Sequence, residues 1–354
     1  MEENYDDYLL SFFNQTSTTD DPESILNETV FYCEKAGVTR FGATFIPTVY
    51  YMNFLLSLLG NGLVLCIIYK YEKLGTVTNI FLLNLVISDL LFASTLPFWA
   101  VYHRSEWIFG PGLCKFIGSL YSIGFSSSIL FLTLMTFDRY LAVVHAITAA
   151  QSRRRLYAYC MSFVVWFLSF FASLKDIVFY NVRLNKPGGW VCEESGYSHQ
   201  TIVKWQLMGY YLQFGVFFLL PLMMMFYCYA RITIRIISTR IQEKCRAIKL
   251  IFVIIFTFFI CWTPYNVVLL LKALHLASRD RSCAEELDYA EYVTRNIAYL
   301  YCCISPVFYT FVGKKFQSHF RKLLAKHIPC LKTTILSSQS SRTTSFRSPN
   351  TEYY

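Results

Sequence analysis

Long apolar stretches alternate with short polar connections along most of the chain. A helix needs about 20 mostly apolar residues to cross a bilayer, and each of these stretches reaches that length. They do not show the ten-residue alternation of membrane β-strands. The pattern predicts an all-α membrane protein, a bundle of seven transmembrane helices at residues 44–70, 77–102, 113–142, 156–180, 204–232, 247–274 and 287–312.

Basic residues in the connections predict how the bundle is oriented. They gather after the first stretch, between the third and fourth, between the fifth and sixth, and after the seventh, at Lys70, Lys73, Arg153, Arg154, Arg155, Arg231, Arg235, Arg240, Lys244, Arg246, Lys314, Lys315, Arg321, Lys322 and Lys326. Connections rich in Lys and Arg stay on the cytoplasmic side. We therefore expect a multi-pass plasma-membrane protein with an extracellular N-terminus and a cytoplasmic C-terminus.

The same pattern divides the chain into four regions. Residues 1–43 form an extracellular head, and residues 44–312 form the transmembrane core. In residues 313–328, Phe and Leu recur at helical spacing among Lys and Arg, which predicts a short amphipathic eighth helix on the inner membrane surface. Residues 329–354 are rich in Ser and Thr, and we expect a disordered cytoplasmic tail.

Composition agrees with a membrane protein and adds an asymmetry of charge. Hydrophobic residues make up 55% of the 354 residues and charged residues only 16%, whereas a soluble chain carries about a quarter charged. The net charge is +9, yet residues 1–34 hold nine acidic residues and no Lys or Arg. Because the basic residues flank the predicted helices, we expect them to serve topology rather than nucleic-acid binding.

Asp89 lies in the middle of the second predicted helix. A charged group inside hydrocarbon is costly and often functional. Asp89 is either a carboxyl that hydrogen-bonds to neighbouring helices for packing, or part of an ion- or proton-linked switch. Four proline residues within the predicted helices favour kinks: Pro97, Pro221, Pro264 and Pro306. Such kinks allow helices to move in a conformational switch, or they are static bends needed for packing.

Several elements together resemble the rhodopsin-like G-protein-coupled receptors. The triplet Asp138-Arg139-Tyr140 is common by chance, but here it ends the third predicted helix at its cytoplasmic edge. The other positions that match this family are Gly60, Asn61, Asp89, Trp166, Pro221, Tyr229, Cys261, Trp262, Thr263, Pro264, Ser305, Pro306, Val307, Phe308 and Tyr309.

This resemblance implies a conformational switch that catalyses nothing and needs no cofactor. Arg139 would rest near Asp138, then turn toward Tyr229 when the sixth helix moves outward about Pro264 and admits a G protein, by resemblance of the inhibitory Gi class. The implied coupling residues are Asp89, Asp138, Arg139, Tyr140, Tyr229, Trp262, Pro264, Pro306 and Tyr309.

Ser305 replaces the Asn that the family carries before the proline of the seventh helix. Ser has fewer ligating and bridging options than Asn. We therefore expect at most a weak sodium site at Asp89 and Ser128, and no other metal.

Local sequence narrows the resemblance to the chemokine receptors. The segments that carry it are Thr95-Leu96-Pro97-Phe98-Trp99, Asp138-Arg139-Tyr140-Leu141-Ala142-Val143-Val144-His145 and Cys302-Cys303-Ile304-Ser305-Pro306. The resemblance implies two disulfides, Cys114–Cys192 and Cys33–Cys283. Because of Arg295 and its surroundings, the chain most resembles the C-class (lymphotactin) branch; a CC-chemokine receptor and a non-signalling chemokine scavenger are the alternatives.

The resemblance also implies where a chemokine ligand would bind. The expected contacts are Tyr5, Tyr8, Trp99, Tyr121 and Arg295. Tyr5 and Tyr8 lie among carboxylates, a context suited to sulfation, and the acidic head would attract a basic chemokine. The alternatives are a head that only improves solubility and an Arg295 that snorkels or pairs with another helix.

Candidate modification sites lie in the head and the tail. Asn14 and Asn27 each begin a glycosylation sequon on the predicted outer side. Cys330 follows the amphipathic segment and is either a palmitoylation site or a free thiol. Phosphorylation would turn a group of tail hydroxyls into an acidic arrestin-binding patch, at Ser337, Ser338, Ser340, Ser341, Thr343, Thr344 and Ser345. The basic inner segments would contact lipid headgroups or the G protein.

Other classes of membrane protein fit less well. Transporters tend to carry internal repeats with matching broken helices, which this sequence does not show. A carboxylate pair for an intramembrane enzyme is not expected, since Asp89 and Asp138 lie on different helices. A retinal photoreceptor needs a Schiff-base Lys in the seventh helix, and residues 287–312 contain none.

Overall fold

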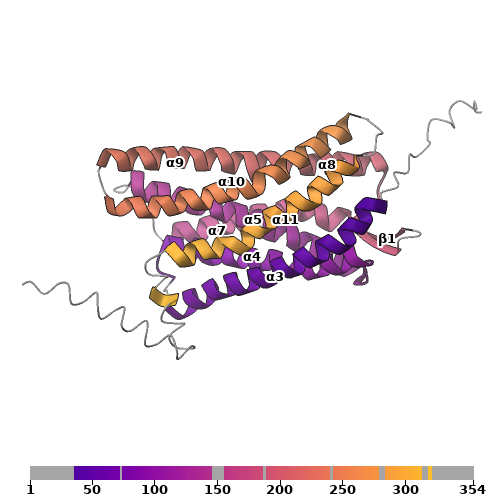
Figure 1. Cartoon of the computed structure of the whole chain (residues 1–354), viewed down its shortest axis with the longest axis horizontal. Helices are drawn as coiled ribbons and strands as arrows, with labels where there is room; N and C mark the ends of the chain where they lie inside the picture. Colours follow the sequence, from indigo (N-terminus) through magenta and orange to yellow (C-terminus); the bar gives the residue numbers. More distant parts are fainter. Residues whose placement is uncertain are drawn as a thin grey trace, which may run out of the picture.

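The computed structural model describes residues 36–71, 74–145, 155–185, 189–239, 242–278, 284–312 and 318–320. Its helices lie lengthwise in one bundle with a short hairpin at one end (Figure 1). The elements are α3 (Ala36–Tyr71), α4 (Val77–Arg104), α5 (Gly110–Val144), α7 (Arg155–Phe179), β1 (Tyr180–Asn185), β2 (Gly189–Glu194), α8 (His199–Phe214), η2 (Gly215–Leu219), α9 (Leu220–Thr239), α10 (Gln242–Ala277) and α11 (Glu285–Val312).

The predicted seven-helix bundle is confirmed. The segments α8, η2 and α9 follow one another as a single span, so that the described residues contain six helices long and apolar enough to cross a membrane, and α11 is the seventh helix. The outer turns of α11 carry acidic residues at Glu285, Glu286 and Asp288. Most helices extend past the predicted apolar stretches, because their ends continue into the water-facing layers; α3 already begins at Ala36.

Side chains are sorted as a bilayer requires. Large apolar side chains face outward, where lipid would cover them; Phe163 on α7, for example, is 70% exposed. Polar side chains are buried between the helices, and Asn61, Asp89 and Asn266 are almost completely inaccessible. Asn61 donates to Ser57 Oγ at 2.9 Å and to the carbonyl of Cys302 at 3.2 Å, which links α3 to α11. Hydrogen bonds between helices are a common source of packing specificity in membranes.

A two-stranded hairpin closes the outer end of the bundle. Strands β1 and β2 pair antiparallel with Val182 opposite Cys192. Cys192 forms a disulfide with Cys114 in the first turns of α5, with their Cα atoms 5.7 Å apart, so this predicted disulfide is confirmed. The Trp107 N–H donates to the carbonyl of Trp190 at 2.8 Å, which ties the hairpin to the connection between α4 and α5.

Proline residues interrupt the helical hydrogen bonding at specific levels. Pro47, Pro97 and Pro264 lie inside α3, α4 and α10. In α4 the hydroxyl of Thr95, two residues before Pro97, donates to the carbonyl of Phe92 at 2.7 Å. Pro221 lies just after the π-helical turn η2, which widens the helix where the proline removes a backbone donor.

Some predicted sites lie outside the described residues. These are the head with Tyr5, Tyr8, Asn14 and Asn27, the disulfide Cys33–Cys283, Cys330 and the tail sites Ser337, Ser338, Ser340, Ser341, Thr343, Thr344 and Ser345. The predicted eighth helix, 313–328, is described only at residues 318–320, which are helical. Pro306 and Tyr309 belong to α11, but only their backbone is described.

Candidate ligand-binding site

Aromatic side chains from three helices and the hairpin meet below the outer end of the bundle. Trp99 on α4 lies 6.4 Å from Tyr121 on α5 and 6.1 Å from Tyr180 on β1, measured between ring centroids. Tyr121 in turn lies 6.0 Å from Tyr299 on α11, and the two hydroxyl groups are in hydrogen-bond contact. The structure thus brings together the predicted contacts Trp99 and Tyr121 and adds Tyr180 and Tyr299 to them.

Close packing of α4 against α5 positions these rings. A Cβ atom on Gly124 would lie 2.6 Å from the backbone nitrogen of Phe92, so the two helices can approach this closely only because Gly124 has no side chain. Phe92 then contacts Tyr121 at 5.3 Å and Tyr299 at 4.9 Å between centroids. Phe92 therefore supports both tyrosines from below.

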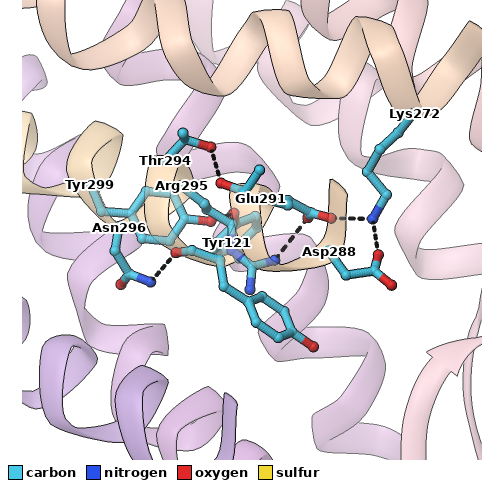
Figure 2. A network of polar contacts seen from close by, with 10 residues as sticks. Tyr121, Lys272, Asp288, Glu291, Thr294, Arg295, Asn296 and Tyr299 are labelled. Atoms are coloured by element: carbon cyan, nitrogen blue, oxygen red, sulfur yellow. Dashed lines mark hydrogen bonds and ion pairs between the residues drawn. The ribbon is translucent and has the colours of Figure 1, made fainter. Parts of the chain in front are cut away.

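Four charged side chains form a network between α10 and α11 (Figure 2). Lys272 donates to Asp288 Oδ1 at 2.8 Å and also contacts Glu291 Oε2. The Nη1 atom of Arg295 donates to Glu291 Oε1 at 3.3 Å. Glu291 lies between the two cations in Figure 2. All four side chains are mostly buried, so water screens their charges weakly.

Arg295 points into the aromatic region. Its guanidinium carbon lies 5.6 Å from the ring centroid of Tyr292, one turn earlier on α11. The imidazole of His103 on α4 lies 6.2 Å from Tyr292 and 6.0 Å from Tyr50 on α3. The predicted contact Arg295 is therefore paired with Glu291 within α11, which is not the pairing with another helix that the alternative described. It also faces the group of aromatic side chains that contains Tyr121.

A second charged cluster joins α5, α7 and β2. Lys175 donates to Asp176 Oδ1 at 2.8 Å and to Glu194 Oε1 at 3.2 Å, and Ser122 donates to the other oxygen of Asp176. Asp176 is buried, and a Lys-Asp pair in the last turns of an apolar helix is the signal that would have pointed to it. Burial raises the pKa of Tyr180, at the base of the hairpin, well above its usual range, so its phenol stays neutral there.

An aromatic path leads from Tyr121 to the predicted switch. Tyr121 stacks on Phe125 at 6.2 Å, and Phe125 contacts Trp262 on α10 at 4.9 Å. Trp262 is buried, with Phe258 at 5.8 Å on its inner side. The predicted switch residue Trp262 thus lies next to this aromatic group, and Pro264 follows it two residues later on α10 with an exposed side chain.

The remaining predicted switch residues lie deeper in the bundle. Ser128 donates to Asp89 Oδ1 at 2.5 Å, so the predicted pair is in contact. At the inner end, Thr78 donates to Asp138 Oδ2 at 3.1 Å and Tyr140 contacts His145 Nε2 at 3.0 Å. Arg139 is exposed at this end, whereas Tyr229 is buried.

Comparison with known proteins identifies the class. Residues 60–309 match the profile of the 7 transmembrane receptor (rhodopsin family), and the chain belongs to that family. It is a multi-pass plasma-membrane receptor and not an enzyme.

Its relatives define the branch. The chain is 41% identical over 300 residues to C-C chemokine receptor type 3 of Cavia porcellus, which spans 84% of this chain and 83% of the relative. It is 37% identical over 294 residues to human C-C chemokine receptor type 4, with 82% and 81% covered, and 37% identical over 300 residues to human C-C chemokine receptor type 1, with 84% of each. The chain is therefore a chemokine receptor, and these relatives give the lymphotactin expectation no support.

Proposed function

We propose that this receptor binds an extracellular CC-class chemokine and activates a heterotrimeric G protein of the Gi class, which leads to calcium mobilisation and chemotaxis. The observation that carries the proposal is the charged network of Lys272, Asp288, Glu291 and Arg295, which lies beside the aromatic group that contains Tyr121. A region where a few charged groups converge beside aromatic side chains suits the end of a peptide chain. The CC class is supported by the relatives.

Binding would take place in two stages. The acidic head, with nine carboxylates in residues 1–34, first attracts the basic chemokine, and Tyr5 and Tyr8 contact it. The N-terminal segment of the chemokine then enters between α4, α5 and α11 and contacts Trp99, Tyr121 and Arg295. The proposed second disulfide, Cys33–Cys283, would hold the head beside this entrance.

Activation would follow the aromatic path. A ligand that displaces Tyr121 moves Phe125 and Trp262, and α10 then moves outward about Pro264. Arg139 turns toward Tyr229 and contacts the G protein; Asp89, Asp138, Tyr140, Pro306 and Tyr309 take part in the same rearrangement. A ligand shifts this equilibrium only by its differential affinity for the two states.

The inner surface would carry the later partners. Membrane lipid contacts the basic connections, and Cys330 is a candidate second anchor. Phosphorylation of the tail hydroxyls would add negative charge and recruit arrestin.

Lymphotactin is the second candidate ligand, because Arg295 and its neighbours in α11 resemble the C-class branch. The two ligand classes predict the same mechanism and differ only in which chemokine fits the pocket.

A Gi biosensor in transfected cells tests the proposal. Purified CC chemokines and lymphotactin are applied one at a time, and Arg139→Ala is the uncoupled control. A response to CC chemokines, lost in Arg139→Ala, is expected. A response to lymphotactin alone would transfer the proposal to the C class. Silence from every chemokine, with surface expression and uptake of labelled chemokine demonstrated, would replace signalling by scavenging.

A further inference from the structure

One edge of the Arg295 guanidinium is buried without a partner. Nη1 donates to Glu291, whereas Nε and Nη2 are buried and have no hydrogen-bond partner among the described residues. A guanidinium has five N–H donors and keeps its proton in a protein. Buried donors that remain unpaired are uncommon and costly, so each one calls for an explanation.

The nearby carboxylates are already engaged. Lys272 pairs with Asp288 and with one oxygen of Glu291, so Glu291 divides its charge between two cations. Figure 2 shows the guanidinium of Arg295 on the side of Glu291 that faces away from Lys272. Arg295 therefore donates one rather long hydrogen bond, to one oxygen of a carboxylate that it shares with Lys272.

The other groups around Arg295 are aromatic. Tyr292 lies under the guanidinium, and Tyr50 lies close enough to interact with it electrostatically. His103 contacts the rings of both tyrosines. Phenols are neutral at physiological pH and do not balance a cation, but they can donate hydrogen bonds to an anion.

We propose that the Nε–Nη2 edge of Arg295 receives a carboxylate of the ligand, namely an acidic side chain in the chemokine segment that enters the pocket. Nε and Nη2 point in the same direction and form a planar fork that matches the two oxygens of a carboxylate. This inference rests on the proposed function, because it states what the ligand of that same pocket carries. It also makes Arg295 a specificity-determining residue, since a segment with only a terminal ammonium group would meet an unbalanced cation.

A double-mutant cycle between ligand and receptor tests this contact. The full-length receptor is held in cell membranes, and the probe is the recombinant CC chemokine, or lymphotactin, that binds it most tightly. Each Asp or Glu in the N-terminal segment of that chemokine is changed to Asn or Gln. One of these changes is expected to weaken binding to the unmodified receptor about 10- to 100-fold, the effect of losing a hydrogen-bonded charge pair.

The same ligand change is expected to weaken binding to Arg295→Gln less than about twofold, because the partner is already gone. Arg295→Lys keeps the positive charge but cannot bind both carboxylate oxygens side by side, so it should recover only part of the affinity. If Arg295→Gln does not reach the cell surface, Arg295→Lys takes its place in the cycle. Arg183→Gln is the matched control. Arg183 pairs with Glu193 on the exposed hairpin, and its loss should leave the full sensitivity to the ligand carboxylate.

Three results would overturn the inference. The tightest chemokine could carry no acidic residue in its N-terminal segment, every amide variant could bind as the unmodified chemokine does, or the sensitivity could persist undiminished in both Arg295 variants. In all three the chemokine still binds, so the proposed function stands. If no chemokine binds the unmodified receptor, the proposed function fails and the inference falls with it.

Discussion

The ring of Phe125 on α5 contacts the indole of Trp262 on α10, with 4.9 Å between centroids and 61° between the planes. Phe125 also stacks on Tyr121, at 6.2 Å and 6°. A single ring therefore separates Tyr121 from Trp262, which lies two residues before Pro264. This arrangement lets a small displacement of Tyr121 reach α10 through direct contacts.

The first prediction concerns this ring. In Phe125→Leu the contact with Trp262 is lost while the pocket side chains remain. We expect signalling potency to fall about tenfold, the value of an aromatic pair, with chemokine affinity nearly unchanged. A Gi biosensor measures the first quantity and labelled-chemokine binding the second. Phe163→Leu, on the lipid-facing side of α7, is the matched control; an equal loss of potency there would contradict the assignment.

The second prediction concerns the packing of α4 against α5. In Gly124→Ala the added methyl group meets the backbone of Phe92, which cannot move aside as a flexible side chain would. We expect a destabilisation of about 1–3 kcal/mol, the usual cost of overpacking. Thermal unfolding of the purified receptor in detergent measures it. Gly62→Ala should be neutral, because a Cβ atom there has no neighbour within 4 Å.

The third prediction concerns the cluster at the outer end of α7. Lys175→Met leaves the carboxylates of Asp176 and Glu194 without their cation. Removing one partner of a mostly buried ion pair costs about 3–5 kcal/mol, and partial exposure of Lys175 places this site toward the lower value. Loss of surface expression and a lower unfolding temperature are the expected results.

Two further variants control the third prediction. Adding Asp176→Asn to Lys175→Met should restore part of the stability, because it removes one of the two unbalanced charges. Breaking the exposed pair of Arg183 and Glu193 with Arg183→Gln should cost less than about 1 kcal/mol. Equal losses in Lys175→Met and Arg183→Gln would show that the cluster does not stabilise the bundle.

The fourth prediction concerns the inner end of the bundle. The hydroxyl of Thr78 on α4 donates to Asp138 on α5 at 3.1 Å, directly before the proposed coupling residue Arg139. In Thr78→Val this bond between helices is lost, and we expect higher Gi signalling in the absence of ligand. Thr136→Val is the control, since Thr136 donates only to the carbonyl of Leu132 in its own helix. Unchanged basal signalling in Thr78→Val at equal surface expression would refute the role of this bond.

The bundle could be predicted from the sequence because hydropathy alone marks a membrane-spanning helix. The seven stretches located the helices, and the extra turns at their ends could not be foreseen, since a helix continues into water without any apolar signal. The π-helical turn η2 was also unforeseen. The residues Gly215–Leu219 look like any apolar helix, and only the approach to Pro221 gives a reason for the wider turn.

The candidate site was predicted in part. Trp99, Tyr121 and Arg295 were expected and lie around one region, but Lys272, Asp288 and Glu291 were missed. Asp288, Glu291 and Arg295 are spaced three and four residues apart on α11, a pattern that places them on one face and could have revealed part of the network. The contribution of Lys272 depends on how α10 packs against α11, which no local pattern contains.

The bond network between Lys272 and α11 has a mechanical consequence for α10. It pins the helix near its outer end, whereas on the inner side Gln242 lies 22 positions before Pro264. At 1.5 Å per residue this arm is about 33 Å long, so a hinge rotation of about 10° at the proline would carry the cytoplasmic tip roughly 6 Å sideways. A shift of less than 1 Å close to the hinge thus becomes a displacement of about 6 Å at the cytoplasmic end of α10, because the inner arm of the helix is long.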